Sequence, residues 1–228
     1  MSAAVGSTGP LAAAAFASGG GTNLQALLDH TTDLWRIRLL VADRDGIGAL
    51  ERAHRAGVAT RVIRTKERSE DDVAAETLAA LEEHGVQVIF LAGYLKLVPA
   101  AVVARFRRRI LNIHPALLPS FGGKGMWGHH VHEAVLASGM RISGPTVHFV
   151  DEHYDRGTIV AQWPVPVLPD DTPNTLAARV LTFEHRLYPL AADHVCRAVA
   201  DGREPGALAL PGEAFSLVPD AKAAGPAT

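Results

Sequence analysis

Short runs of hydrophobic residues alternate along the chain with longer segments in which hydrophobic residues recur at helical spacing. The clearest runs lie at residues 11–17, 36–42, 58–63 and 86–92. The last of these reads VQVIFLA, which is typical of a strand buried on both faces. Alternation of such runs with helical segments predicts an α/β fold, in which a mainly parallel twisted sheet is flanked by helices on both faces.

Capping residues predict where two of the helices begin. Ser69 is followed by acidic residues in the first helical turn and predicts an N-cap, and Gly85 predicts the end of the same helix. Thr172 followed by Pro173 predicts the start of the last helix, because proline is tolerated at the first helical position. Pro189 lies inside that last helix and predicts a kink or a break there.

The middle of the chain is predicted to be less regular. A short strand, RILNIH at 109–114, leads into a proline- and glycine-rich loop that runs to Gly128. A short helix at 129–138 and two strands at 144–150 and 158–167 follow. No repeat or linker interrupts this order, so a single domain is predicted. The predicted boundaries are a disordered tail at 1–9, the domain at 10–202 and a C-terminal extension at 203–228.

Composition narrows the classes of function. Hydrophobic residues make up 48% and charged residues 20% of the 228 residues, which argues against general disorder. The net charge of −2 lacks the basic excess of proteins that bind nucleic acid. No hydrophobic run reaches the roughly 18 residues that cross a membrane. A secretion signal requires basic residues near its start, and the first lysine or arginine of this chain is Arg36. With Cys196 as the single cysteine, the chain is predicted to be cytoplasmic.

A glycine turn, SGGGTN at 18–23, lies between the first predicted strand and a helix. Exposed backbone N–H groups and the positive end of a helix make this geometry suitable for an anion such as phosphate. The turn is not a Walker motif, because no GK[ST] follows. Nor is it a dinucleotide fingerprint, because Leu24 stands where the third glycine belongs. A tight turn without a ligand is the alternative.

The strand that ends in LNIH carries two polar side chains on one face. Residues two apart in a strand point the same way, so Asn112 and His114 project together while Leu111 and Ile113 face the other side. An amide and an imidazole can both donate hydrogen bonds to the negative charge that develops when a carbonyl is attacked. Their position at the carboxyl end of a parallel strand is where open α/β sheets bind ligands.

A carboxylate is predicted to lie close to this pair. The stretch VHFVDEHYDRG, which starts at Val147, places Asp151 and Asp155 on the loop after a strand. A carboxylate beside His114 would raise the pKa of the imidazole above its ordinary value of about 6.5 and keep it protonated near neutral pH. Spacing alone does not choose between the two aspartates.

Five stretches of the sequence, taken together, resemble a known enzyme family. They are SGGGTNLQAL from Ser18, LAGYL from Leu91, NIHPALLPSF from Asn112, VHFVDEHYDRG from Val147 and FEHRLYP from Phe183. In this order they are similar to the folate-dependent formyltransferases, and in particular to the phosphoribosylglycinamide (GAR) formyltransferases, also called GAR transformylases. The resemblance implies a Rossmann-like formyltransferase fold.

The resemblance also implies roles for individual residues. The catalytic triad corresponds to Asn112, His114 and Asp155, which selects one of the two aspartates. The site for GAR corresponds to Gly20, Gly21, Thr22, Asn23, Pro115 and Glu184. The site for folate corresponds to Arg68, Leu95, Lys96, Leu97, Val98, Asn112 and Asp151.

The implied reaction transfers the formyl group of 10-formyltetrahydrofolate, a co-substrate, to the amine of GAR in de novo purine biosynthesis. It passes through a tetrahedral intermediate and needs no metal. Asn112 and His114 would hold the oxyanion, Asp155 would orient and charge His114, and a water would relay the amine proton. The implied partners are small molecules, with no nucleic acid and no membrane, and the protein is expected to be a monomer or a homodimer.

Three features depart from the family pattern. The first strand, LAAAAFA at 11–17, is unusually rich in alanine. The stretch GGKGMWGHHVH at 122–132 is longer than in the simplest members, and Leu181 stands where a polar residue often lies beside the ligand. The histidines of HHVH lack the i, i+4 pair and the nearby cysteine typical of a zinc site, so no metal is predicted.

Other functions remain as alternatives. The nearest are a formyltetrahydrofolate hydrolase and a related formyltransferase acting on another phosphorylated sugar amine. A nicotinamide-dependent oxidoreductase is disfavoured by the missing third glycine. A ligand-binding module without catalysis is disfavoured by the convergence of Asn112 and His114.

Overall fold

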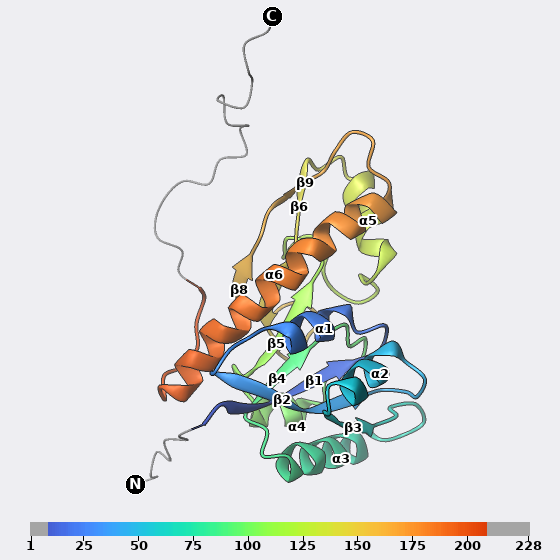
Figure 1. The fold of residues 1–228 in the computed structure, drawn as a ribbon. Helices are drawn as coiled ribbons and strands as arrows, with labels where there is room; N and C mark the ends of the chain where they lie inside the picture. The colour runs from blue at the N-terminus through green and yellow to red at the C-terminus, as the bar shows by residue number, and fades with distance from the viewer. Residues whose placement is uncertain (1–8, 209–228) are drawn as a thin grey trace, which may run out of the picture.

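The computed structural model describes residues 9–208. The predicted tail at 1–9 and extension at 203–228 therefore lie largely outside the described residues. Within them, one twisted sheet of seven strands forms the centre of the molecule, with helices on either side (Figure 1). No helix in this part of the chain has the length and hydrophobicity needed to cross a membrane.

The strand order in the main sheet is β3-β2-β1-β4-β5-β7-β8. Its strands are β1 (Leu11–Ala17), β2 (Trp35–Ala42), β3 (Ala59–Val62), β4 (Val88–Leu91), β5 (Ile110–His114), β7 (Thr146–Phe149) and β8 (Ile159–Gln162). The first five strands in that order are parallel, whereas β7 is antiparallel to both β5 and β8. The predicted α/β fold with a mainly parallel sheet is confirmed.

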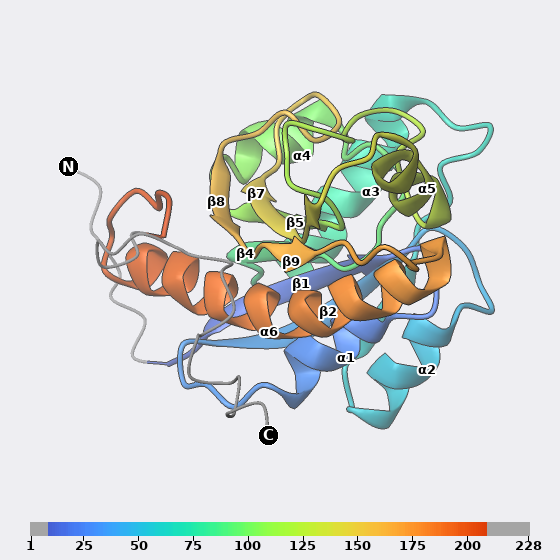
Figure 2. The same cartoon turned by 90° about the horizontal axis from the view of Figure 1, so that it is seen from above.

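Helices cover both faces of the sheet (Figure 2). They are α1 (Thr22–Asp29), α2 (Gly48–Arg55), α3 (Glu70–Glu83), α4 (Ala100–Arg105), α5 (His129–Ala137) and α6 (Pro173–Ala200). The hydrophobic core on one face joins the sheet to α1, α2 and α6, and the core on the other face joins it to α3 and α4. α5 packs against α6 beyond the edge of the main sheet.

The alanine-rich strand β1 is explained by its position. It lies between β2 and β4, and Ala13, Ala14 and Ala15 are all fully buried. Alternate alanines face the two different cores, which suits a central strand covered on both sides. Burial therefore outweighs the low strand propensity of alanine.

The predicted strand at 158–167 is wrong as a single element. The chain forms β8, then breaks at Pro164, and resumes as β9 (Val165–Pro166). β9 pairs with β6 (Ile142–Ser143) in a separate two-stranded sheet. Proline has no N–H to give to a strand ladder, so the main sheet cannot continue through Pro164.

The two predicted helix starts are confirmed. The Ser69 hydroxyl accepts a hydrogen bond from Asp72 N–H at the start of α3, and Thr172 forms a capping box with Thr175 at the start of α6. The predicted break at Pro189 is wrong, because α6 is one continuous helix of 28 residues. Leu187, Tyr188 and their neighbours in the next turn are buried in the core, so packing on the sheet compensates for the hydrogen bond that proline cannot make.

Candidate active site

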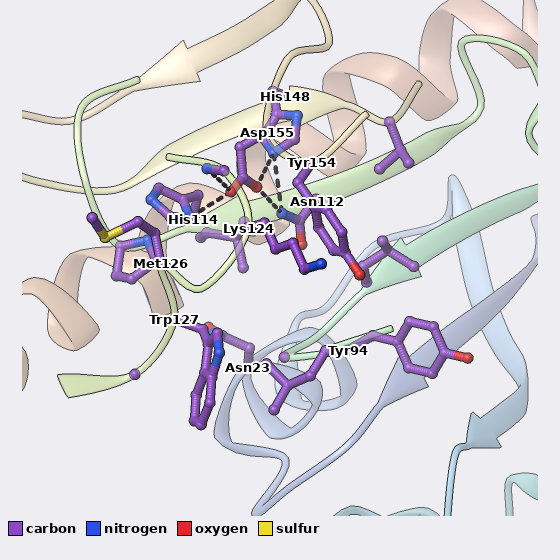
Figure 3. A pocket seen from close by; sticks show the side chains of 18 of the residues that line it. Asn23, Tyr94, Asn112, His114, Lys124, Met126, Trp127, His148, Tyr154 and Asp155 are labelled. Carbon is purple, nitrogen blue, oxygen red and sulfur yellow. Dashed lines mark hydrogen bonds and ion pairs between the residues drawn. The ribbon is translucent and has the colours of Figure 1, made fainter. Parts of the chain in front are cut away.

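A cavity of about 620 Å³ opens at the carboxyl ends of β4 and β5. It is also lined by the loop at 123–129, by the loop at 150–155 and by one side of α6 (Figure 3). Open α/β sheets bind their ligands at this edge, because the strands end there and the following loops supply polar groups. The cavity contains Asn112, His114 and Asp155, the three residues that the sequence assigns to catalysis.

Asn112 and His114 reach the cavity from the same face of β5, as their spacing predicts. β5 pairs with the antiparallel strand β7, which places His148 directly opposite Asn112. The Asn112 amide Nδ2 lies 3.0 Å from His148 Nε2 and 3.5 Å from an Asp155 oxygen. An amide nitrogen carries two hydrogens, and the second has only this long contact, so it is available to an incoming oxygen.

Asp155 is the carboxylate that meets the two histidines. Its Oδ2 lies 3.6 Å from His114 Nδ1 and its Oδ1 lies 3.5 Å from His148 Nε2. Gly123 N–H donates a hydrogen bond of 2.9 Å to Asp155 Oδ2. Asp151 instead accepts a hydrogen bond from the backbone of His153. The structure therefore brings Asp155, and not Asp151, beside His114.

The predicted rise in the pKa of His114 is wrong. Burial lowers the pKa of this imidazole more than the negative charge of Asp155 and the Phe121 carbonyl raise it. His114 Nε2 lies 2.8 Å from the Phe121 carbonyl oxygen, which can only accept, so Nε2 carries a hydrogen and donates it. The protein without substrate therefore holds a neutral His114 at neutral pH.

The pKa of Asp155 is depressed. Burial by itself would raise it, but the interactions with His148, His114 and the Gly123 N–H together outweigh that effect. The carboxylate is consequently ionised across the physiological pH range. Asp155 also has a backbone φ of 54°, an unusual value for a residue other than glycine. Strained backbone of this kind is often found at functional sites.

His148 is a site residue to which the sequence reasoning assigned no role. A signal was present, because Thr146 and His148 share the two-residue spacing of Asn112 and His114 and lie on one strand face. Knowing that β7 pairs with β5 was also necessary, and sequence spacing does not reveal that pairing. His148 Nδ1 lies 2.8 Å from the Phe149 carbonyl oxygen, which leaves Nε2 directed at the Asn112 amide.

The glycine turn forms the start of α1, and Gly21 adopts the left-handed conformation at its N-cap. Within residues 9–208, no protein group accepts a hydrogen bond from the N–H groups of Gly20, Gly21 or Thr22. Asn23 follows in the first turn, and its Nδ2 donates a hydrogen bond of 2.6 Å to Glu184 on α6. Burial raises the pKa of Glu184, with the Asn23 hydrogen bond acting in the opposite direction.

The remaining predicted residues divide into two groups. Most line the cavity, namely Asn23, Leu95, Lys96, Leu97, Val98, Pro115, Asp151 and Glu184. Gly20, Gly21 and Thr22 do not line it, and neither does Arg68, which precedes α3 and forms an ion pair with Glu76. The predicted role of Arg68 thus has no support from its position.

The long loop predicted at 122–132 contributes several residues to the cavity. Figure 3 shows Lys124, Met126 and Trp127 along one side, with the Lys124 ammonium pointing into the open space. None of these three was assigned a role from the sequence. Trp127 is 51% exposed at the rim, and glycines with positive φ at 123, 125 and 128 surround it.

Gly122 packs directly against Asp155. A Cβ at this position would lie 2.5 Å from the Leu118 side chain and 3.1 Å from Asp155 Cβ. Gly122→Ala is therefore expected to displace Asp155 and lower kcat by about tenfold or more, since small displacements of catalytic groups are costly. Steady-state kinetics would measure this, with Gly206→Ala as the control, because a Cβ at Gly206 meets nothing within 4 Å. Equal kcat values in the two variants would contradict the expectation.

His132 on α5 is a second buried histidine at the cavity. It is 4% exposed, and its Nδ1 has no hydrogen-bond partner. Burial lowers its pKa to about 4, and the charges of His129 and His114 act in the same direction. Among residues 9–208, no group of three or more histidine, cysteine or acidic side chains is arranged to hold a metal.

The depressed pKa of His132 predicts how stability depends on pH. The unfolded chain takes up a proton near pH 6.5, whereas the folded chain does so only near pH 4. Stability from this group is therefore complete above about pH 6.5 and lost as the pH falls toward 4, by up to ~1.4 kcal/mol per pH unit. When the pH is lowered from about 7 to about 5, the free energy of unfolding measured by urea denaturation should fall less for His132→Gln than for the parent protein. The control is His54→Gln at an exposed site on α2, which should behave like the parent protein.

Comparisons with known proteins agree with this geometry. The formyl transferase family matches residues 12–192. The chloroplastic phosphoribosylglycinamide formyltransferase of Arabidopsis thaliana is 45% identical over 85% of this chain and 68% of its own length. The Escherichia coli phosphoribosylglycinamide formyltransferase is 35% identical over 82% of this chain and 85% of its own length.

Solved structures give the same result. Glycinamide ribonucleotide transformylase 1 from Symbiobacterium toebii superposes with a TM-score of 0.77 and 37% identity, covering 86% of this chain and 91% of its own. Phosphoribosylglycinamide formyltransferase from Brucella melitensis superposes with a TM-score of 0.75 and 42% identity, covering 82% of this chain and 96% of its own. The chain therefore belongs to the formyl transferase family, and within it to the phosphoribosylglycinamide formyltransferases.

Proposed function

We propose that this enzyme transfers the formyl group of 10-formyltetrahydrofolate to the amine of GAR, the acceptor named by its relatives. The observation that carries the proposal is the convergence of Asn112, His114 and Asp155 in one cavity at the carboxyl ends of the strands. Hydrogen-bond donors beside an ionised carboxylate suit attack of an amine on a carbonyl group.

The cavity fits a folate. Its volume of about 620 Å³ lies within the range of about 300–1,000 Å³ usual for organic ligands. Leu95, Leu97 and Val98 offer apolar surface to a ring system, and Asp151 offers a polar contact in the same cavity. These residues would hold the folate, which supplies the formyl group when bound.

GAR would occupy the neighbouring space near α1. The N–H groups of Gly20, Gly21 and Thr22, which have no acceptor among the described residues, suit its phosphate, because an anion is favoured at a helix N-terminus. The Glu184 carboxylate suits the hydroxyl groups of its ribose, as an acceptor held in place by Asn23. Pro115 lines the cavity directly after His114.

The charge on His114 would appear only during the reaction. As negative charge develops on the formyl oxygen, it favours the imidazolium over the neutral ring and raises the pKa of His114. Asp155 already favours that charged form. The amine of GAR would lose its proton as the new C–N bond forms, and a water held near the Asp155 carboxylate would pass that proton to His114. The same proton would then be available to the folate nitrogen, which leaves as the formyl C–N bond breaks. An interaction that forms only as this charge develops stabilises the transition state and not the bound substrates. It therefore lowers the activation barrier of the transfer without tightening substrate binding.

The test is a spectrophotometric assay of folate turnover, run with GAR and with no acceptor. Turnover that requires GAR would support the proposal. Folate release without an acceptor would indicate a hydrolase, and turnover with a different phosphorylated sugar amine in place of GAR would indicate a related transferase. Either result would contradict the proposed acceptor.

The remaining proposals concern the protein as a whole. The domain is proposed to span 10–202, and the protein is proposed to be a cytoplasmic monomer or homodimer. Light scattering on the purified protein would measure its oligomeric state, and a trimer or larger assembly would contradict that part of the proposal.

A further inference from the structure

Helix α2 holds the glycine turn through two hydrogen bonds, although it contributes no residue to the 620 Å³ cavity. Ala49 N–H donates to the Gly19 carbonyl oxygen at 3.1 Å. Arg52 Nε donates to the Gly20 carbonyl oxygen at 2.8 Å. Figure 2 shows α2 lying beside α1 on the same face of the sheet. The two contacts therefore join the start of α2 to the turn that precedes α1.

These two bonds also determine where the N–H groups of the turn point. A peptide group is planar and trans, so its carbonyl oxygen and its N–H point in opposite directions. The Gly19 carbonyl belongs to the same peptide as Gly20 N–H, and the Gly20 carbonyl to the same peptide as Gly21 N–H. Binding the two oxygens to α2 consequently directs both N–H groups away from it. Both of these N–H groups lack a protein acceptor within residues 9–208.

The turn and α2 approach each other so closely that side chains are excluded. Gly21 has a φ of +75°, and a Cβ there would lie 2.8 Å from both Cα and Cβ of Ala49. A Cβ on Gly48 would lie 3.0 Å from the Gly20 carbonyl oxygen. Because the backbones are in direct contact, the turn has little freedom to move relative to α2.

Arg52 adds charge to this contact. Its guanidinium is always protonated, and its Nη1 donates a second hydrogen bond, of 3.0 Å, to Gln25 Oε1 on α1. A positive donor on the Gly20 oxygen polarises the peptide, which makes Gly21 N–H a stronger donor in turn. Arg52 thus both orients the turn and strengthens its affinity for an anion.

We propose that Arg52 is a positioning residue, which aims and strengthens the N–H groups that bind the phosphate of GAR. The inference rests on the proposed function, since it names the phosphate as that of GAR. It extends that function by assigning the geometry of the phosphate site to α2, an element outside the catalytic cavity.

The kinetic test is Arg52→Ala in the full chain. The KM for GAR is expected to rise about ten- to a hundredfold, the range that corresponds to losing a charge-assisted hydrogen bond. The KM for 10-formyltetrahydrofolate and kcat are expected to stay within about twofold of the parent values. Arg52→Lys keeps the charge and should cause a smaller rise. The matched control is Arg55→Ala, one turn along the same helix, where the side chain is exposed and its single hydrogen bond within residues 9–208 is to the Glu51 carbonyl.

A binding test separates this inference from the proposed reaction. Calorimetric titration with ribose 5-phosphate reports the phosphate site whether or not GAR is the acceptor. Weaker binding by Arg52→Ala, with parent-like binding by Arg55→Ala, would support the inference even if GAR were not turned over. Unchanged ribose 5-phosphate affinity, or equal rises in both KM values, would overturn it. If Arg52→Ala fails to fold, Arg52→Lys decides the question by the same two measurements.

Discussion

Asp155→Asn is expected to lower kcat for GAR-dependent turnover by about 10²–10⁴-fold, the usual contribution of a general acid–base group. The amide keeps the shape of the side chain but removes the negative charge that lies 3.6 Å from His114 Nδ1. Burial disfavours the imidazolium, and Asp155 is the main group that favours it. Without the carboxylate, His114 would stay neutral as charge develops on the formyl oxygen.

The measurement is steady-state kinetics with both substrates varied, so that kcat and each KM are obtained separately. KM values near those of the parent would show that the loss lies in the chemical step. Asp170→Asn, at an exposed position before α6, is the control for a carboxylate-to-amide change. A larger loss of kcat in Asp151→Asn than in Asp155→Asn would contradict the assignment, because Asp151 lines the same cavity without contacting His114.

Asn112→Ala is expected to lower kcat by about 10²–10³-fold, the usual cost of removing one donor to an oxyanion. One Asn112 N–H is directed at His148, and the other is available to the formyl oxygen. Truncation removes this donor and also leaves His148 Nε2 without its closest partner. Asn112→Ala is therefore expected to destabilise the transition state and to change the binding of either substrate much less.

Rapid-quench measurement of a single turnover would isolate the chemical step of Asn112→Ala from product release. Asn174→Ala, at an exposed site in the first turn of α6, is the matched control and should react at the parent rate. A single-turnover rate within about tenfold of the parent would show that Asn112 does not stabilise the developing charge.

Local sequence patterns determined most of the secondary structure of this protein. Periodicity located the strands that became β1, β2 and β4, and the caps at Ser69 and Thr172 located two helix starts. Two-residue spacing placed Asn112 and His114 on one face of β5. These features depend on residues within a few positions of one another, so they can be derived without knowing the fold.

Long-range pairing decided which groups meet at the site. The antiparallel register of β5 and β7 sets His148 opposite Asn112, and the loop after β7 brings Asp155 to His114. The resemblance to a family selected Asp155 over Asp151, but spacing did not, because a loop can carry either residue inward. The contact of α2 with the glycine turn likewise joins segments that no local pattern connects.

Burial explains two of the predictions from the sequence that were wrong, the pKa of His114 and the break at Pro189. A carboxylate beside His114 predicts a raised pKa, yet the buried site lowers it, because removing an imidazolium from water costs more than one neighbouring charge returns. Pro189 predicts a kink or a break in the last helix, and the break is wrong, because α6 continues through Pro189, packed on the sheet. The sequence by itself determined the elements and the chemical groups of this protein. The tertiary structure alone decided their environment, because burial and long-range contacts exist only once the chain has folded.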